Sequence, residues 1–224
     1  MTTARDRILL RVRSSLGVTA DDTARKDMAA DRIAEHPVTL LPERATRSGE
    51  ALYAQFRALL EGQQATIVEV AEASAVPAAV LDYLVASGLP ASIRIGEDAR
   101  LASMPWTDTE GLTVLKGAAE AGDRAGLSHA IAGISETGTL VIAAGRDNPV
   151  TLAFMPETHV VVVERHSIVA SYEAALAIVR ERFGANGMPR TLNYISGPSR
   201  TADIGGKIVI GAHGPRRLGI IVAG

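Results

Sequence analysis

The segment ISGPSRTADI, residues 195–204, contains the residue types that bind small anions. A turn of small residues at the end of a strand can direct several backbone N–H groups at an anion. The Arg200 guanidinium adds a planar fork that matches two carboxylate or phosphate oxygens, and Ser199 and Thr201 add hydroxyl donors. We therefore expect Gly197, Ser199, Arg200 and Thr201 to bind a small anion, with a carboxylate as the preferred ligand.

Glu136 and His213 are the candidate catalytic residues. Glu136 lies in GISETGTL, residues 133–140, a polar turn in which two glycines leave the backbone accessible. His213 lies in GAHGPRRL, after an apolar stretch that reads as a strand, and its imidazole could act as a general base.

Each of these segments also has a structural interpretation that the sequence leaves open. Arg200 could pair with Asp203 in an ordinary turn. Glu136 could cap a helix or stay solvated, and His213 could donate a hydrogen bond to a backbone carbonyl.

The sequence carries no recognisable cofactor or metal motif. It has no cysteine, which excludes disulfides, thiolate catalysis and cysteine-bound iron–sulfur clusters in this chain. Its five histidines show no close metal-ligand spacing. Neither G-x-G-x-x-G nor a P-loop motif occurs, so a dinucleotide or nucleoside triphosphate site has no support. We expect no metal and no cofactor in this chain.

Charge and hydropathy restrict the partners and the location. The net charge is −2 and aromatic residues make up 4%, whereas nucleic-acid binding usually shows a basic surplus with stacking aromatics. The first 17 residues contain charges that interrupt the apolar stretch a signal peptide needs. The longest apolar runs are far shorter than the roughly 20 residues of a membrane span. We expect a cytoplasmic protein that neither spans a membrane nor binds nucleic acid.

The chain divides into an N-terminal arm with a connector, residues 1–48, and an α/β domain, residues 49–224. Apolar residues at helical spacing predict an amphipathic helix over residues 4–16. The stretch 18–48 has mixed charge and a solvated composition before HPVTLLPERA, residues 36–45, whose two prolines discourage long regular structure. We expect a mobile or partner-dependent connector.

Helical and strand-like patterns alternate beyond residue 49, which favours a parallel sheet covered by helices. Helices are predicted over 51–62, 76–90 and 171–184. Strands are predicted within 65–71, 91–96, 113–118, 139–145, 159–165, 191–196, 207–212 and 219–224.

Four motifs in this order resemble the LUD family, in particular its LutC-type lactate utilisation proteins. They are GISETGTLVI, LAFMPETHVVVVERHSIV, ISGPSRTADI and GAHGPRRLGIIV. The resemblance covers roughly residues 50 to 224, and RILLRVRSSLG near the N-terminus looks like the opening helix of the family. The family usually has a glutamate after the TADI element, where this chain has Gly205.

The resemblance implies a fold and a function. The fold is a NagB/RpiA/CoA-transferase-like α/β sheet with helices on both faces, to which this chain adds the N-terminal helical arm. The function is a role in the oxidation of L-lactate to pyruvate, in a system whose other members are iron–sulfur proteins. Such partners would hold the redox clusters that a chain without cysteine lacks.

Three hypotheses for this subunit stay open. In the first, it binds a small carboxylate or organises the lactate-oxidising assembly without catalysing the redox step. In the second, it is a separate acyl-CoA transferase-like enzyme with Glu136 as nucleophile. The third, a binder of sugar phosphates or folate-type ligands, rests on analogy of fold alone.

Overall fold

The computed structural model describes residues 3–38, 40–184, 187–204 and 207–224. The chain separates into two compact units, Met1–Leu40 and Leu41–Gly224. The predicted boundary at residue 48 lies close to this division and stays a prediction.

The first unit consists of two helices of equal length, α1 (Ala4–Leu16) and α2 (Thr23–Glu35). Thr3 begins α1 with a capping box, in which its side chain and that of Asp6 each accept a hydrogen bond from the other residue's backbone N–H. The helix α2 lies in the part of the predicted connector that precedes HPVTLLPERA, and the sequence pattern did not predict it. Asp22 caps this helix by accepting a hydrogen bond from the Arg25 N–H, and both prolines of the segment lie beyond its end.

The second unit is built on a parallel sheet of six strands in the order β1-β12-β7-β4-β2-β3. Each neighbouring pair in this sheet is parallel. The strands are β1 (Thr66–Val70), β2 (Ser92–Ile95), β3 (Thr113–Lys116), β4 (Ala125–His129), β7 (Thr158–Glu164) and β12 (Arg217–Ala223).

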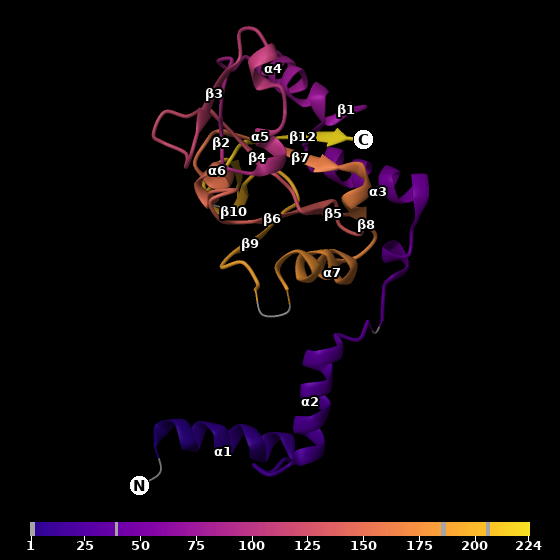
Figure 1. The fold of residues 1–224 in the computed structure, drawn as a ribbon. Coiled ribbons are helices and arrows are strands. Elements are labelled where there is room, and N and C mark those ends of the chain that lie inside the picture. Colours follow the sequence, from indigo (N-terminus) through magenta and orange to yellow (C-terminus); the bar gives the residue numbers. More distant parts are fainter. Residues whose placement is uncertain (1–2, 39, 185–186, 205–206) are drawn as a thin grey trace. The chain divides into compact units, whose positions relative to one another are not determined.

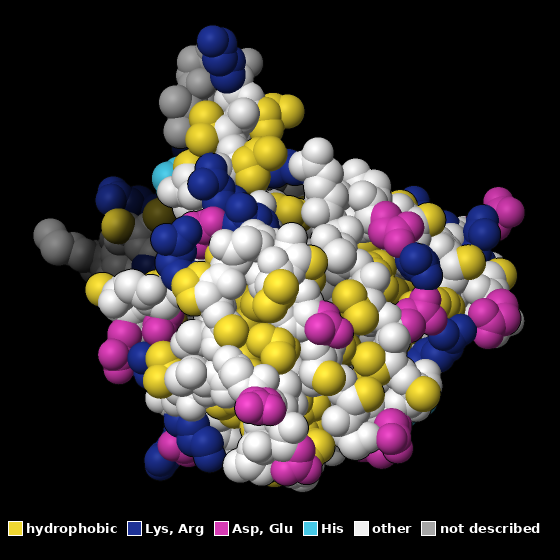
Figure 2. Space-filling view, turned by 90° about the horizontal axis from the view of Figure 1, so that it is seen from above, with side chains coloured by type: hydrophobic (Ala, Val, Ile, Leu, Met, Phe, Trp, Pro, Cys, Tyr) yellow, Lys and Arg dark blue, Asp and Glu magenta, His cyan; other side chains and the backbone are white. Residues whose placement is uncertain are grey.

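Side chains of the central strands alternate between two hydrophobic clusters, one on each face of the sheet. On one face, Val160 and Val162 pack with the helices α4 (Val76–Ala86) and α5 (Ala99–Ala102). In Figure 1, α4 lies above the sheet. Figure 2 looks onto this side of the molecule, where hydrophobic side chains lie among acidic and uncharged ones.

The opposite face is covered by the helix α3 (Gly49–Gly62) and by a second sheet. Val161 and Val163 pack there against Phe56 and Leu60 of α3, both of which are fully buried. The second sheet has the order β8-β5-β6-β9, and its outer face packs against α7 (Tyr172–Phe183), which is drawn below this sheet in Figure 1. Its strands are β5 (Ala132–Ile134), β6 (Thr139–Ala143), β8 (Ile168–Val169) and β9 (Leu192–Ile195).

Short elements complete the domain. The helix α6 (Val150–Phe154) precedes β7, and four 3-10 turns connect longer elements: η1 (Glu43–Ala45), η2 (Ala73–Ala75), η3 (Trp106–Asp108) and η4 (Arg165–Ser167). The strands β10 (Arg200–Ile204) and β11 (Lys207–Ile210) pair as an antiparallel ribbon. The segment predicted as one loop, residues 195–204, therefore contains the end of β9, a turn and the strand β10.

The predicted α/β class with a mostly parallel sheet and helices on both faces is confirmed. The sequence pattern did not predict the second sheet between the parallel sheet and α7. None of the helices in the described part of the chain is long and apolar enough to cross a membrane.

Candidate functional site

A cavity of about 260 Å³ opens at the amino ends of β7 and β12. Its wall combines α6, the end of β9, the turn into β10 and the segment before β12. The residues that line it are Ala153, Phe154, His159, Tyr194, Ile195, Ser196, Gly197, Pro198, Ser199, Arg200, His213, Gly214, Pro215 and Leu218.

Three of the sequence motifs line this cavity, and hydrogen bonds join two of them. The Ser199 N–H donates to the Pro215 carbonyl at 2.8 Å, and the Ser199 carbonyl accepts from the Gly211 N–H at 2.9 Å. These bonds hold the ISGPSR turn against the GAHGP segment, which brings Gly197, Ser199, Arg200 and His213 to one wall. They also use the Ser199 N–H internally, so this group is not one of the donors for a bound anion. Thr201 is not among the described residues that line the cavity.

The end of α3 supports the ISGPSR turn from behind. Gly197 has φ 155°, and a Cβ at this position would lie 2.9 Å from Cβ of Gln63, so only glycine fits without a shift. Arg200 donates to the Gln63 carbonyl oxygen at 2.8 Å, to Gln63 Oε1 at 3.1 Å and to Gln64 Oε1 at 3.0 Å. These contacts fix the direction of the guanidinium. The side chain of Asp203, the alternative partner of Arg200, and Gly205 lie outside the part of the structure that is described.

Four hydroxyl groups connect this turn to the GISETGTL turn. Thr139 Oγ1 lies 2.7 Å from both Thr137 Oγ1 and Ser196 Oγ, and the Tyr172 hydroxyl accepts from Thr137 at 3.1 Å. Thr139 is fully buried, so its hydrogen bond holds the Ser196 side chain in a fixed position in the cavity wall. The remaining motif, GISETGTL, thus supports the cavity through Thr137 and Thr139.

Glu136 lies apart from the other predicted site residues. It is 8% exposed, and its Oε1 is 3.4 Å from an Nη atom of Arg44. Its backbone N–H donates to the Ala170 carbonyl. Glu136 is not one of the described residues of the cavity wall, so the structure does not join it to His213 or to the Arg200 turn. A catalytic role for Glu136 stays a prediction.

His159 is a cavity residue that the sequence analysis did not select. Its imidazole is buried, with Nε2 3.0 Å from Ser128 Oγ and Nδ1 without a hydrogen-bond partner among the described residues. Burial lowers the pKa of His159 to about 3, so the ring is neutral near pH 7. The sequence signal is a histidine one position into an otherwise apolar strand, THVVVVE.

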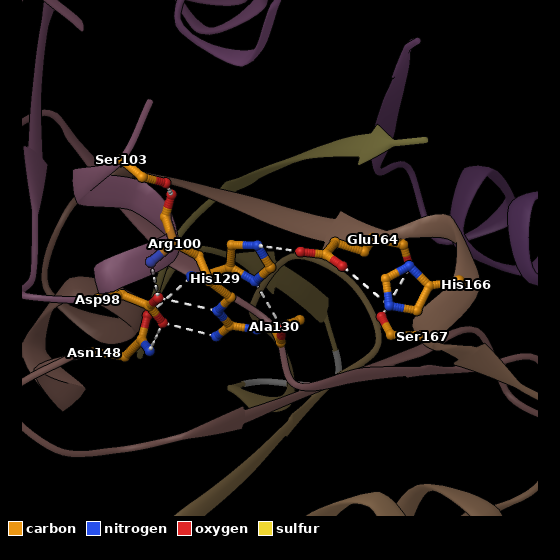
Figure 3. A network of polar contacts seen from close by, with 9 residues as sticks. All are labelled: Asp98, Arg100, Ser103, His129, Ala130, Asn148, Glu164, His166 and Ser167. Atoms are coloured by element: carbon orange, nitrogen blue, oxygen red, sulfur yellow. Dashed lines mark hydrogen bonds and ion pairs between the residues drawn. The ribbon is translucent and has the colours of Figure 1, made fainter. Parts of the chain in front are cut away.

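A second polar cluster lies at the opposite, carboxyl end of the parallel sheet (Figure 3). Asp98 is 1% exposed and binds Arg100 with two oxygens, Oδ1 to Nε at 3.0 Å and Oδ2 to Nη2 at 2.7 Å. Burial opposes ionisation of Asp98, but the hydrogen bonds and charge of Arg100 outweigh it and keep the pKa of Asp98 below its usual value. Asn148 joins the cluster by donating to Asp98 at 3.2 Å and accepting from the His129 N–H at 2.9 Å.

The imidazole of His129 faces the side chain of Glu164 in this cluster (Figure 3). His129 Nδ1 lies 2.8 Å from the Ala130 carbonyl, which can only accept, so Nδ1 carries the proton. Nε2 lies 3.8 Å from Glu164 Oε1, whose other carboxylate oxygen is 3.1 Å from His166 Nε2. Burial and the charge of Arg100 lower the pKa of His129. Hydrogen bonds of Arg100 and Asn148 connect the segments that follow β2, β4 and β6. This cluster therefore has a structural role.

The described residues contain no group of three or more histidine, aspartate or glutamate side chains placed to hold a metal ion. The expectation that the chain carries no metal or cofactor stays a prediction.

Comparison with known proteins supports the family resemblance. Residues 118–223 match the model of the LUD domain, and all four motifs lie within this range. The resemblance to the LUD family is confirmed by this match, which begins later in the chain than the predicted start near residue 50.

Several curated relatives that this chain matches are named Lactate utilization protein C. Lactate utilization protein C of Anoxybacillus flavithermus is 36% identical over 105 residues, which are 46% of this chain and 46% of that protein. Lactate utilization protein C of Bacillus subtilis is 33% identical over 119 residues, 52% of this chain and 48% of that protein. The chain thus spans about half the length of the curated relatives it matches.

One solved structure shares the fold. The crystal structure of a DUF162 family protein from Deinococcus radiodurans superimposes with a TM-score of 0.58 at 27% identity. The match covers 80% of this chain and 99% of that protein.

Proposed function

From the LUD domain that residues 118–223 match, we propose that this protein is a subunit of a lactate utilisation system that oxidises L-lactate to pyruvate. The relatives named Lactate utilization protein C support this assignment. The observation that carries it further is the meeting of the ISGPSR turn and the GAHGP segment at one cavity, because both belong to the motifs shared with the family.

Within this system the chain binds the carboxylate of a small substrate or product. The cavity of about 260 Å³ suits a ligand of a few heavy atoms, below the volume of most drug-sized sites. Arg200 supplies the positive charge. Its Nη1 and Nη2 groups already donate to Gln63 and Gln64, so it attracts the carboxylate by its charge and through the N–H groups that these bonds leave free. The hydroxyl groups of Ser196 and Ser199 and the His213 imidazole line the same wall and supply further hydrogen bonds.

The redox step belongs to partner proteins in this proposal. Oxidation of lactate to pyruvate releases two electrons and two protons, and the electrons need an acceptor. A chain without cysteine does not hold a cysteine-bound iron–sulfur cluster, so iron–sulfur subunits of the same system accept them. The proposal includes a cytoplasmic location for the assembly, which fractionation of the native cells tests.

Purification from native cells grown on L-lactate tests the assignment. We expect iron–sulfur proteins to co-purify with the chain, and L-lactate-dependent reduction of an added dye to require them. The isolated chain should be colourless and inactive. Robust lactate oxidation by the isolated chain, or purification without any iron–sulfur protein, would contradict the proposal.

The alternative, an acyl-CoA transferase-like enzyme with Glu136 as nucleophile, has less support. The Glu136 carboxylate contacts Arg44 and is outside the described wall of the cavity. Mass spectrometry after incubation with an acyl-CoA tests it. A thioester adduct on Glu136 that is absent from a Glu136→Gln variant would establish the alternative.

A further inference from the structure

His159 combines two properties that no other described residue of the cavity shares. Its side chain is buried, at 1% exposure, and its Nδ1 has no hydrogen-bond partner in the described structure. A buried polar group without a hydrogen-bond partner destabilises the unliganded protein. A ligand that pairs with Nδ1 removes this destabilisation on binding.

The position of His159 in the cavity separates it from other unpaired groups. Tyr53, His129 and Thr158 also have a buried polar atom without a partner among the described residues, but none of them lines this cavity. Thr158 is the adjacent residue of β7 and its side chain points to the other face of the sheet, as alternation along a strand requires.

We propose that His159 recognises a hydroxyl group beside the carboxylate of the bound ligand, so that the cavity selects 2-hydroxycarboxylates. This inference rests on the proposed function, in which Arg200 binds the carboxylate.

Hydrogen-bonding chemistry favours a hydroxyl over other groups. The Ser128 hydroxyl can either donate to His159 Nε2 or accept from it. In the first case Nδ1 carries the ring proton and is a donor, and in the second case Nδ1 is an acceptor without a proton. A ligand hydroxyl matches both forms because it both donates and accepts, whereas a keto oxygen matches only the donor form. A methylene group matches neither.

The low pKa of the ring agrees with this role. With a pKa of about 3, His159 is neutral under physiological conditions and does not compete with Arg200 for the carboxylate. Nδ1 lies below the surface of the cavity wall, so binding includes a small side-chain adjustment of the kind that catalytic hydrogen bonds often need when a ligand arrives.

Ligand titrations of the full chain test the inference. L-lactate, pyruvate and propionate are titrated by calorimetry against the wild type, His159→Leu and Thr158→Val. We expect wild type to bind L-lactate on the order of tenfold more tightly than propionate, since one hydrogen bond contributes up to about 1.5 kcal/mol. His159→Leu should lose this preference and keep its affinity for propionate, and Thr158→Val should keep the preference.

The possible failures are distinct. Equal affinities of wild type for L-lactate and propionate would overturn the role of His159 and leave a carboxylate site intact. Binding of none of the three ligands would overturn the carboxylate site as well. If His159→Leu does not fold, the ¹⁵N resonance of His159 Nδ1 decides: it should shift with L-lactate and not with propionate, and an identical response to both would refute the inference.

Discussion

At the residue scale, Arg200 is the charged group on which the proposed carboxylate site depends. Its guanidinium is exposed but is oriented by three hydrogen bonds to Gln63 and Gln64. Replacement by lysine keeps the charge and removes the planar fork. Arg200→Lys should weaken carboxylate binding by ~1.5–3 kcal/mol, the range for a hydrogen bond to a charged group, with little change in melting temperature.

Titration with L-lactate and thermal melts of the same variants check this prediction. Arg146→Lys is a matched control, because Arg146 is a highly exposed arginine outside the cavity. Arg200→Ala should bind at least as weakly as Arg200→Lys. Unchanged affinity in Arg200→Ala, together with lowered melting temperatures in Arg200→Ala and Asp203→Ala, would favour the structural pairing over the binding role.

His159 should also make the protein sensitive to acid. Burial lowers its pKa from 6.5 to about 3, so the unfolded chain takes up the proton first as the pH falls. Its contribution to stability is complete above about pH 6.5 and decreases as the pH falls toward 3. Between pH 7 and pH 5 this loss amounts to about 2 kcal/mol, at 1.4 kcal/mol per pKa unit.

Urea denaturation at several pH values measures this effect. The free energy of unfolding of His159→Gln should depend less on pH between 7 and 5 than that of wild type. Thr158→Val is the control, since Thr158 is the buried neighbour of His159 in β7 and does not titrate. A wild-type profile that is flat in this interval would contradict the burial argument.

At the element scale, the GISETGTL turn depends on a close approach to α3. Gly138 has φ 62°, and a Cβ there would lie 2.7 Å from Cβ of Leu59. Gly138→Ala should therefore destabilise the domain by at least ~1–2 kcal/mol, the cost of left-handed backbone for a residue with a side chain. Gly62→Ala, at the end of the same helix and with open space around it, should be nearly neutral. Equal melting temperatures for the two variants would show that the turn tolerates a side chain.

Local pattern predicted most helices and strands of the α/β unit, because their apolar residues repeat with the period of the element. It did not predict β4, whose sequence AGLSH contains a glycine and two polar residues although every position is buried. Burial of Ser128 and His129 depends on partners far along the chain, namely His159 for Ser128 and Asn148 for His129. The pairing of β5 with β8 and of β6 with β9 also depends on tertiary contacts, so the local pattern did not predict it.

The candidate site could be predicted only in part, because some of its residues have a local sequence signal and others depend on tertiary contacts. Residue types alone selected Arg200, Ser199 and His213, and the structure places these three on one cavity wall. His159 carries no local signal beyond a polar residue in an apolar strand. Its place in the cavity follows from the parallel pairing of β7 with β12, which aligns His159 with Leu218 at the amino edge of the sheet.

At the scale of the whole molecule, the α/β unit forms its hydrophobic core from its own residues. All members of its three hydrophobic clusters lie between residues 52 and 223. The helices α1 and α2 of the other unit contain no buried residue, and each is 13 residues long. Isolated helices of this length are marginal in water. The match to the solved structure covers 99% of that protein but only 80% of this chain. That protein therefore forms the fold with fewer residues.

A chain that begins at residue 41 should therefore fold and bind its ligand as the full chain does. We expect its melting temperature to stay within a few degrees of the full-length value, since ~1 kcal/mol shifts a domain of this size by about 2–4 °C. Its affinity for L-lactate should be unchanged, because every described residue of the cavity lies beyond residue 150. Differential scanning calorimetry and titration of the two chains measure both quantities. A large fall in melting temperature with unchanged affinity would assign the arm a stabilising role, and a loss of affinity would place part of the ligand site in the first 40 residues.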